Sequence, residues 1–161
     1  MPWAEVPLQP TGSGDCELYA TAYITRLFGH SATPEVVRSW AEETRFLKAR
    51  YPEKVHGVKA SWGCWTAAAG LDVAISYSQY PGFAEWVRAY AAHGCVGLAI
   101  MHLRADYGHA VVILEADESG VLLADSCRGL VRDPWEFFKC PIPDGFPTRV
   151  EAWYRVPVAG T

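Results

Sequence analysis

The chain has 161 residues, of which 50% are apolar, 13% aromatic and 20% charged, with a formal net charge of −4. This length is the size of one domain, and the composition excludes a disordered polymer. The acidic balance argues against a nucleic-acid partner, and no apolar run approaches the roughly 18 residues of a membrane span. We therefore expect one domain over residues 1–161 that binds neither nucleic acid nor a membrane.

The first predicted element is a buried helix. The segment that precedes it is rich in Pro and Gly and is expected to be extended. Asp15 is a favourable N-cap, so the helix should begin at or just after it and run to about Phe28, where Gly29 ends it. Only two charged residues occur between positions 16 and 28. Most faces of this helix must therefore be covered by protein.

Further helices are predicted before residue 93. Thr33 is a suitable N-cap and Pro34 favours a first turn, so a second helix should begin there. A short helix is expected over 62–71. A longer one is expected over 83–92, where Pro81-Gly82 introduces it.

The second half of the sequence predicts strands. The segments are short, rich in Val, Ile, Leu and Tyr, and bounded by Gly, Pro or Asp. They cover 95–103, 109–116, 121–125 and 149–156, with a weaker strand at 73–77. Because helices precede strands, we predict an α+β fold in which N-terminal helices pack on a C-terminal antiparallel sheet.

Three residues could form a nucleophilic site. Cys16 stands at the start of the buried helix, where unpaired backbone N–H groups and the positive end of the helix dipole favour a thiolate. His109 opens one predicted strand and Asp125 closes the next, and a bend at 117–120 would make the two a hairpin. A thiol nucleophile, an imidazole base and a carboxylate that orients the base form a catalytic triad. Taken singly, each residue also has a plain structural interpretation in packing or in a turn.

The register of this hairpin constrains the hypothesis. The positions of His109 and Asp125 sum to an even number. Their side chains therefore share one face of the sheet only if the connecting loop has an odd number of residues or a β-bulge interrupts the pairing. We expect one of these two features between the strands.

Around these residues the sequence resembles the bacteriocin-processing peptidases, which are papain-like cysteine proteases that remove double-glycine leaders. The first half of the family pattern is a Gln, a spacer, Asp-Cys, and a helix that ends in an aromatic residue, Gly and His. It corresponds in this chain to Gln9, Asp15-Cys16 and Phe28-Gly29-His30. The second half is a His that opens a strand, followed about sixteen residues later by an Asp and then a Gly. It corresponds to His109, Asp125 and Gly129.

The resemblance implies a papain-like fold and a cysteine peptidase that acts on a peptide or protein substrate. It assigns Cys16 as nucleophile, His109 as base, Asp125 as the group that orients the base, and Gln9 as a donor to the oxyanion. Hydrolysis of a peptide or isopeptide bond would proceed through a thioester. The resemblance covers most of the chain, although the region 50–95 matches no part of the pattern.

The sequence departs from the family at three positions. Glu17 replaces the usual Gly after the nucleophile, Ser126 replaces the usual Pro, and Gln9 lies one residue farther from Cys16 than in the family. No transporter segment follows, so we expect a stand-alone peptidase. Three alternatives remain: an acyltransferase, a peptidoglycan amidase with the same triad, and an inactive papain-like binding module in which Glu17 obstructs the thiol.

The remaining cysteines carry no expected chemistry. The five cysteines are odd in number and scattered, without a C-x-x-C pair, which favours free thiols in a reducing compartment and predicts no metal or cofactor. Since no hydrophobic stretch follows the start, we predict no signal peptide and a cytoplasmic location. Four cysteines are interpreted as buried packing residues: Cys64, Cys95, Cys127 and Cys140.

Overall fold

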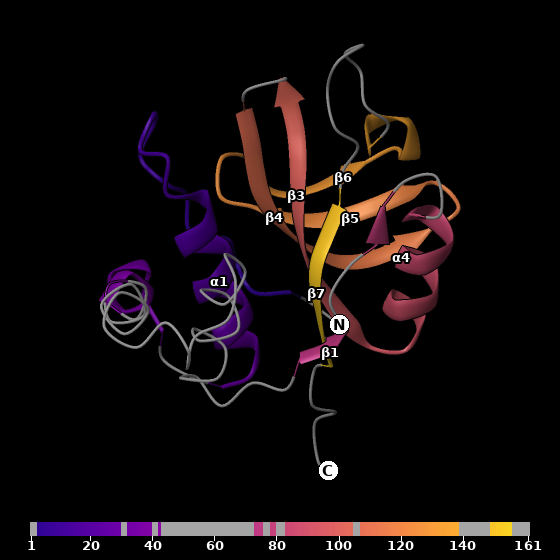
Figure 1. The fold of residues 1–161 in the computed structure, drawn as a ribbon, viewed down its shortest axis with the longest axis horizontal. Coiled ribbons are helices and arrows are strands. Elements are labelled where there is room, and N and C mark those ends of the chain that lie inside the picture. The colour runs from indigo at the N-terminus through magenta and orange to yellow at the C-terminus, as the bar shows by residue number, and fades with distance from the viewer. Residues whose placement is uncertain are drawn as a thin grey trace, which may run out of the picture.

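The computed structural model describes residues 3–29, 32–39, 42, 73–75, 78–79, 83–104, 107–138 and 149–155. Figure 1 shows a sheet with helix α1 on one side and helix α4 on the other. The helices are α1 (Cys16–Leu27), α4 (Phe83–Ala92) and the 3-10 turn η2 (Trp135–Phe138). The strands are β1 (Val73–Ile75), β2 (Ser78–Gln79), β3 (Cys95–Arg104), β4 (Tyr107–Asp117), β5 (Gly120–Asp125), β6 (Gly129–Asp133) and β7 (Arg149–Arg155).

The strands form one antiparallel sheet, as predicted. Its order is β1-β7-β3-β4-β5-β6, and β2 also pairs with β7. Every described strand pair is antiparallel. The last strand, β7, lies between β1 and β3, so residues from the middle and the end of the chain are joined. Strands β2 and β6 were not predicted, because both are short and β6 (Gly-Leu-Val-Arg-Asp) has only two apolar residues, which do not alternate with its charged ones. The predicted helix over 62–71 lies outside the described residues.

Helix α1 begins and ends close to the predicted positions. Asp15 occupies the N-cap position, but its carboxylate makes no capping hydrogen bond. It pairs instead with Arg38, at 3.0 Å, from the helical segment 34–39. The expectation of a side-chain cap at Asp15 was therefore wrong, because an ion pair competes for the same oxygens. Gly29 follows the helix with φ +86, which an L side chain would resist. At Thr33 the predicted cap is confirmed, since its Oγ1 accepts from the Val36 N–H at 3.3 Å.

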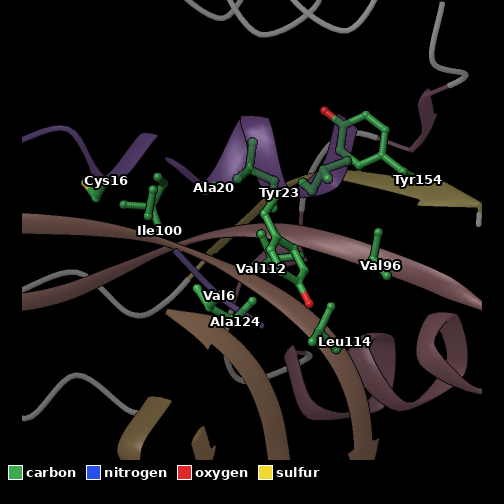
Figure 2. Packing of buried hydrophobic residues seen from close by; sticks show 13 residues of the cluster. Val6, Cys16, Ala20, Tyr23, Val96, Ile100, Val112, Leu114, Ala124 and Tyr154 are labelled. Carbon is green, nitrogen blue, oxygen red and sulfur yellow. The ribbon is translucent and has the colours of Figure 1, made fainter. Parts of the chain in front are cut away.

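One face of the sheet is covered by α1. Ala20, Tyr23 and Ile24 of the helix pack against alternate residues of the central strands. Figure 2 shows Ala20 and Tyr23 between the helix and the sheet, with Cys16 near Ile100. Each large apolar side chain buried in this way contributes about 1.5–3 kcal/mol relative to exposure. The buried first helix predicted from its few charges is confirmed. The sheet residues of this cluster are Val96, Leu98, Ile100, Ala110, Val112, Leu114, Ala124 and Tyr154.

The opposite face of the sheet is covered by α4. Val87 of this helix belongs to a second buried cluster with the strand residues that alternate with those of the first. Tyr90 of α4 stacks on Trp153 of β7, with ring centroids 4.9 Å apart. The predicted packing of an N-terminal helix on the sheet is confirmed for α1, and α4 covers the opposite face. No helix within the described ranges combines the length and the apolar character that a membrane span requires.

The β4–β5 hairpin contains the bulge that the residue numbering requires. A two-residue turn at 118–119 joins the strands, and Asp117 Oδ1 accepts the Ser119 N–H at 2.8 Å. Next to this turn, Glu115 pairs with Leu122. Farther from the turn, Ile113 pairs with Leu123, so that Leu114 is an extra residue on β4 without a partner on β5. A β-bulge thus shifts the register by one residue. This confirms the condition for His109 and Asp125 to share a face.

The tight end of this hairpin yields a testable prediction. A Cβ added at Gly120 would lie 2.2 Å from the carbonyl oxygen of Asp133, at φ +153. Gly120→Ala should therefore lower the free energy of unfolding by about 3 kcal/mol, since both strain and overlap must be relieved. Urea unfolding measures the loss. Gly94→Ala is the control, because its φ is +73 but a Cβ there meets nothing within 4 Å. It should cost only about 1 kcal/mol, and equal losses would contradict the steric argument.

Candidate active site

Cys16 is the first residue of α1 and is buried, with 8% of its surface exposed. A turn precedes it, in which the Ser13 N–H donates to the Pro10 carbonyl at 3.1 Å, and Gly14 has φ +68. Because the first turn of a helix leaves backbone N–H groups without helical partners, the thiol stands where negative charge is favoured. This is the location that the sequence predicted for Cys16.

His109 and Asp125 meet at the ends of neighbouring strands. The His109 Nε2 lies 2.7 Å from Asp125 Oδ1, and the two side chains are only 4% and 1% exposed. The register that pairs Val112 with Ala124, continued by one residue, places Asp125 opposite Val111. His109 is then its diagonal neighbour on the same face. The structure thus brings together the imidazole and the carboxylate that the sequence analysis paired.

Asp125 is held from three directions. Besides His109, its Oδ1 accepts the backbone N–H of Cys127 at 2.8 Å, and its Oδ2 accepts Nε–H of Arg128 at 2.7 Å. Burial alone would raise the pKa of Asp125, but the hydrogen bonds from His109, Cys127 and Arg128 outweigh it and hold the pKa at about 2. The carboxylate is therefore ionised at neutral pH, and it only accepts hydrogen bonds. It follows that Nε2 of His109 carries a proton.

The other ring nitrogen of His109, Nδ1, is not bonded to Asp125. Burial lowers the pKa of His109, but its interactions with Asp125 and Cys16 outweigh that effect and raise the pKa to about 9. Cys16 is thus one of the two residues that favour the protonated imidazole. Nδ1 is buried and makes no hydrogen bond within the described part of the chain. Since Nε2 is taken by Asp125, Nδ1 is the nitrogen available to exchange a proton with Cys16.

Gln9 is fixed to the residue that follows Asp125. Its backbone N–H donates to the Ser126 carbonyl at 2.8 Å, and the Ser126 hydroxyl donates to its Oε1 at 2.5 Å. Its amide Nε2 donates to Ser13 Oγ at 3.3 Å, in the turn before Cys16. The side chain therefore lies between the segment that ends β5 and the turn that leads into α1. In this state the Nε2 donor is used by Ser13.

Cys127 differs from its sequence interpretation. It is exposed, so its assignment as a buried packing residue was wrong, whereas Cys95 is buried as predicted. Cys127 follows β5 in a turn, where the backbone N–H is bonded to Asp125 and the side chain is left outside the core. Burial, the charge of Asp125 and that of Cys16 raise the pKa of the Cys127 thiol. Cys64 and Cys140 lie outside the described residues.

A single group of side chains in the described residues has the composition of a metal site. His109, Asp125 and Cys127 each offer a ligand atom, and these atoms lie within 4.8 Å of one another. The carboxylate oxygens already accept hydrogen bonds from His109, Cys127 and Arg128. A metal would have to replace the 2.7 Å bond between His109 and Asp125. The contacts of His109 and Asp125 are therefore those of a hydrogen-bonded histidine–carboxylate pair.

Sequence reasoning did not identify Arg128 or Ser126 as part of this site. Arg128 bonds Asp125 through a turn, three residues along the chain. Ser126 was noted only as a departure from the family pattern. Neither could be found from residue type alone, because arginines and serines are common in turns and their partners in this fold depend on how the chain folds back.

Comparison with known proteins identifies the class of fold. No protein-family model and no curated protein sequence matches the chain. One solved structure with a similar fold is a double glycine motif protease from an AMS/PCAT transporter, in complex with the leader peptide. It matches with a TM-score of 0.58 and 16% sequence identity, over 94% of this chain and 93% of that one. The Pseudomonas avirulence protein AvrPphB is similar with a TM-score of 0.54 and 10% identity, over 90% and 93%. The chain therefore has the predicted papain-like α+β fold, and it resembles the double glycine motif protease in structure.

The coupled ionisation of His109 predicts a pH-dependent stability. Its pKa is about 9 in the folded protein against 6.5 for a free imidazole. The folded state therefore binds more protons between these values, so this contribution is complete below pH 6.5 and is lost as the pH rises to 9. Asp125→Asn should lower the free energy of unfolding at pH 6 by about 1–3 kcal/mol and flatten the decline between pH 6.5 and 9. Urea titrations across this range test it.

Asp117→Asn is the matched control for this measurement. Asp117 is an exposed carboxylate on the same hairpin, and its pKa is lowered by the Ser119 hydrogen bonds, so it does not titrate above pH 6. This variant should retain the wild-type decline between pH 6.5 and 9. A wild-type curve that is flat in this range would contradict the ionisation proposed for His109.

Proposed function

We propose that this protein is a cysteine peptidase in which Cys16 is the nucleophile, His109 the general base and acid, and Asp125 the group that orients the imidazole. The observation that carries the proposal is the buried 2.7 Å bond between His109 and Asp125. It is supported by Cys16, which stands at the start of α1 and raises the pKa of the same imidazole. The likeness to a double glycine motif protease in complex with a leader peptide supports a peptide substrate.

The chemistry follows from the geometry. Proton transfer from Cys16 to Nδ1 of His109 gives a thiolate, which attacks the carbonyl carbon of the scissile bond. The tetrahedral intermediate collapses as His109 protonates the leaving amine, and a thioester to Cys16 remains. Water then attacks the thioester while His109 accepts its proton, which releases the carboxylic acid and regenerates the thiol. Proton transfer of this kind contributes about 10²–10⁴ in rate.

Asp125 and the start of α1 support the charges that form. Asp125 accepts from Nε2 and so keeps Nδ1 directed at the thiol, and its negative charge stabilises the imidazolium. In this scheme the backbone N–H of Cys16 and the Gln9 amide donate to the oxyanion. Gln9 must then exchange its 3.3 Å bond to Ser13 for one to the substrate oxygen. Losing one such donor costs about 10²–10³ in rate.

The nucleophile is tested by replacing one thiol at a time. Cys16→Ala should reduce hydrolysis by at least about 10³-fold, because it removes the thiol that stands at the start of α1 and interacts with His109. The measurement uses a fluorogenic peptide library that includes Gly-Gly sequences, with cleavage products identified by mass spectrometry. Cys127→Ser is the control, since it removes a nearby exposed thiol but leaves the backbone bond to Asp125. Full turnover by the Cys16→Ala variant would falsify the triad.

The proposed donor Gln9 is tested with its two neighbours. Gln9→Ala should lower kcat by about 10²–10³ with little change in KM. Ser126→Ala should lower kcat less, because the Oε1 end of the amide is released while the Nε2 donor remains. Ser13→Ala should not lower kcat, since the Ser13 hydroxyl competes with the oxyanion for Nε2. If Gln9→Ala changes KM alone, Gln9 contributes to substrate binding and not to the oxyanion.

A further inference from the structure

Arg128 connects the carboxylate of the proposed triad to a second carboxylate. Its Nε–H donates to Asp125 Oδ2 at 2.7 Å. Its two terminal nitrogens donate to the two oxygens of Asp133, at 3.0 and 2.7 Å. The planar guanidinium thus uses one edge for each carboxylate, which is the arrangement that its rigid set of donors allows.

The second carboxylate has a fixed position in the sheet. Asp133 is the last residue of β6, is 7% exposed, and pairs with Val121 of β5. Arg128 itself lies over the ring of Phe137, with its Cζ 5.4 Å from the ring centroid. Phe138, the next residue, is fully buried. Arg128 is therefore positioned by β6 and η2, two elements that contribute no residue to the triad.

We propose that Arg128 is a positioning residue that holds the Asp125 carboxylate in the orientation in which it bonds His109. This inference rests on the proposed function. With Oδ2 bonded to Arg128, rotation of the carboxyl group is restricted and Oδ1 stays directed at Nε2. Arg128 is neutralised by the bidentate pair with Asp133, so it orients Asp125 without cancelling the negative charge that the imidazolium requires. Asp133 is the group that makes this possible.

A lysine cannot replace Arg128 in this arrangement. Its ammonium is a single point charge and lacks the fork that reaches Asp125 with one edge and Asp133 with the other. Both Arg128→Lys and Arg128→Gln should therefore lower kcat by about 10–100-fold with KM unchanged, as displacement of a catalytic group does. Asp133→Asn should lower kcat in the same direction but less, since Nε of Arg128 still reaches Asp125.

Arg132 provides the matched control. It is the other arginine of this hairpin region, and it pairs with exposed Asp117 at 3.1 Å and with Glu115 at 3.7 Å. Arg132→Gln removes the same charge from the neighbouring strand without touching Asp125. Its kcat and KM should equal those of the wild type. The unfolding midpoint of each variant, measured by urea titration, establishes that the compared proteins are folded.

A second measurement follows the imidazolium directly and needs no peptide substrate. Iodoacetate alkylates a thiolate faster when a neighbouring imidazolium attracts its carboxylate, so the rate at Cys16 should fall as His109 loses its proton. Among the described residues, the titratable groups that face His109 are Cys16 from α1, Asp125 from β5 and Cys127 from the turn after β5. The wild-type rate should fall near pH 9. In Arg128→Gln the fall should move toward pH 6.5, because the Asp125 carboxyl group is then held by the Cys127 N–H alone and bonds Nε2 less well.

The two measurements separate this inference from the proposed function. If wild-type Cys16 is alkylated no faster than Cys127 at neutral pH, as read by mass spectrometry of the labelled peptides, the proposed peptidase is wrong. If wild-type Cys16 is selectively alkylated, and folded Arg128→Gln matches the wild type in both kcat and the pH of the alkaline fall, the positioning role of Arg128 is wrong. A loss in Arg132→Gln equal to that in Arg128→Gln would also overturn it.

Discussion

The buried hydrogen bond between His109 and Asp125 is the constraint on which the rest of this site depends. Both side chains are almost inaccessible to solvent, and a buried polar group without a partner costs free energy comparable to a lost hydrogen bond or more. The two residues therefore have to lie on the same face at adjacent strand ends. A two-residue turn alone would place them on opposite faces, and the bulge at Leu114 corrects this. The β-bulge at Leu114, some distance from His109 and Asp125 along the strands, thus determines whether their side chains can meet.

The other half of the site depends on how the N-terminal segment is attached. The position of Cys16 is set by α1, which lies across the sheet and is buried there through Tyr23 and Ile24. The extended chain before α1 is bonded to both layers. The Tyr23 hydroxyl of α1 donates to the Ala4 carbonyl at 2.9 Å, and Gln9 is bonded to Ser126 in the turn after β5. The thiol and the histidine–carboxylate pair therefore come from separate layers, and the contacts between those layers set their relative position.

Much of this arrangement follows from the sequence, and the reasons are local. Helix α1, its end at Gly29 and the main strands are predicted by caps, glycines and apolar patterns. The pairing of His109 with Asp125 follows from the order of the strands. Because their positions sum to an even number, their side chains share a face only with a β-bulge or a loop that has an odd number of residues. The position of the bulge at Leu114 does not follow, because it depends on how the side chains on both faces pack.

Asp15 likewise meets Arg38 only in the folded chain. The residues that sequence analysis missed act through tertiary contacts of the same kind: Arg128 is an ordinary turn residue until β6 brings Asp133 to it. The sequence therefore predicts the residues of the proposed triad better than the residues that position them.

The charges of the site form an alternating series. When Cys16 is a thiolate, it faces the His109 imidazolium, then the Asp125 carboxylate, the Arg128 guanidinium and finally the Asp133 carboxylate. Each buried or half-buried charge has a neighbour of opposite sign, which lowers the cost of holding it away from water. Because the members are coupled, a proton lost at one position changes the proton affinity of the next. The protonation of His109 is therefore linked through Asp125 to Arg128 and Asp133, which lie beyond that carboxylate in the series.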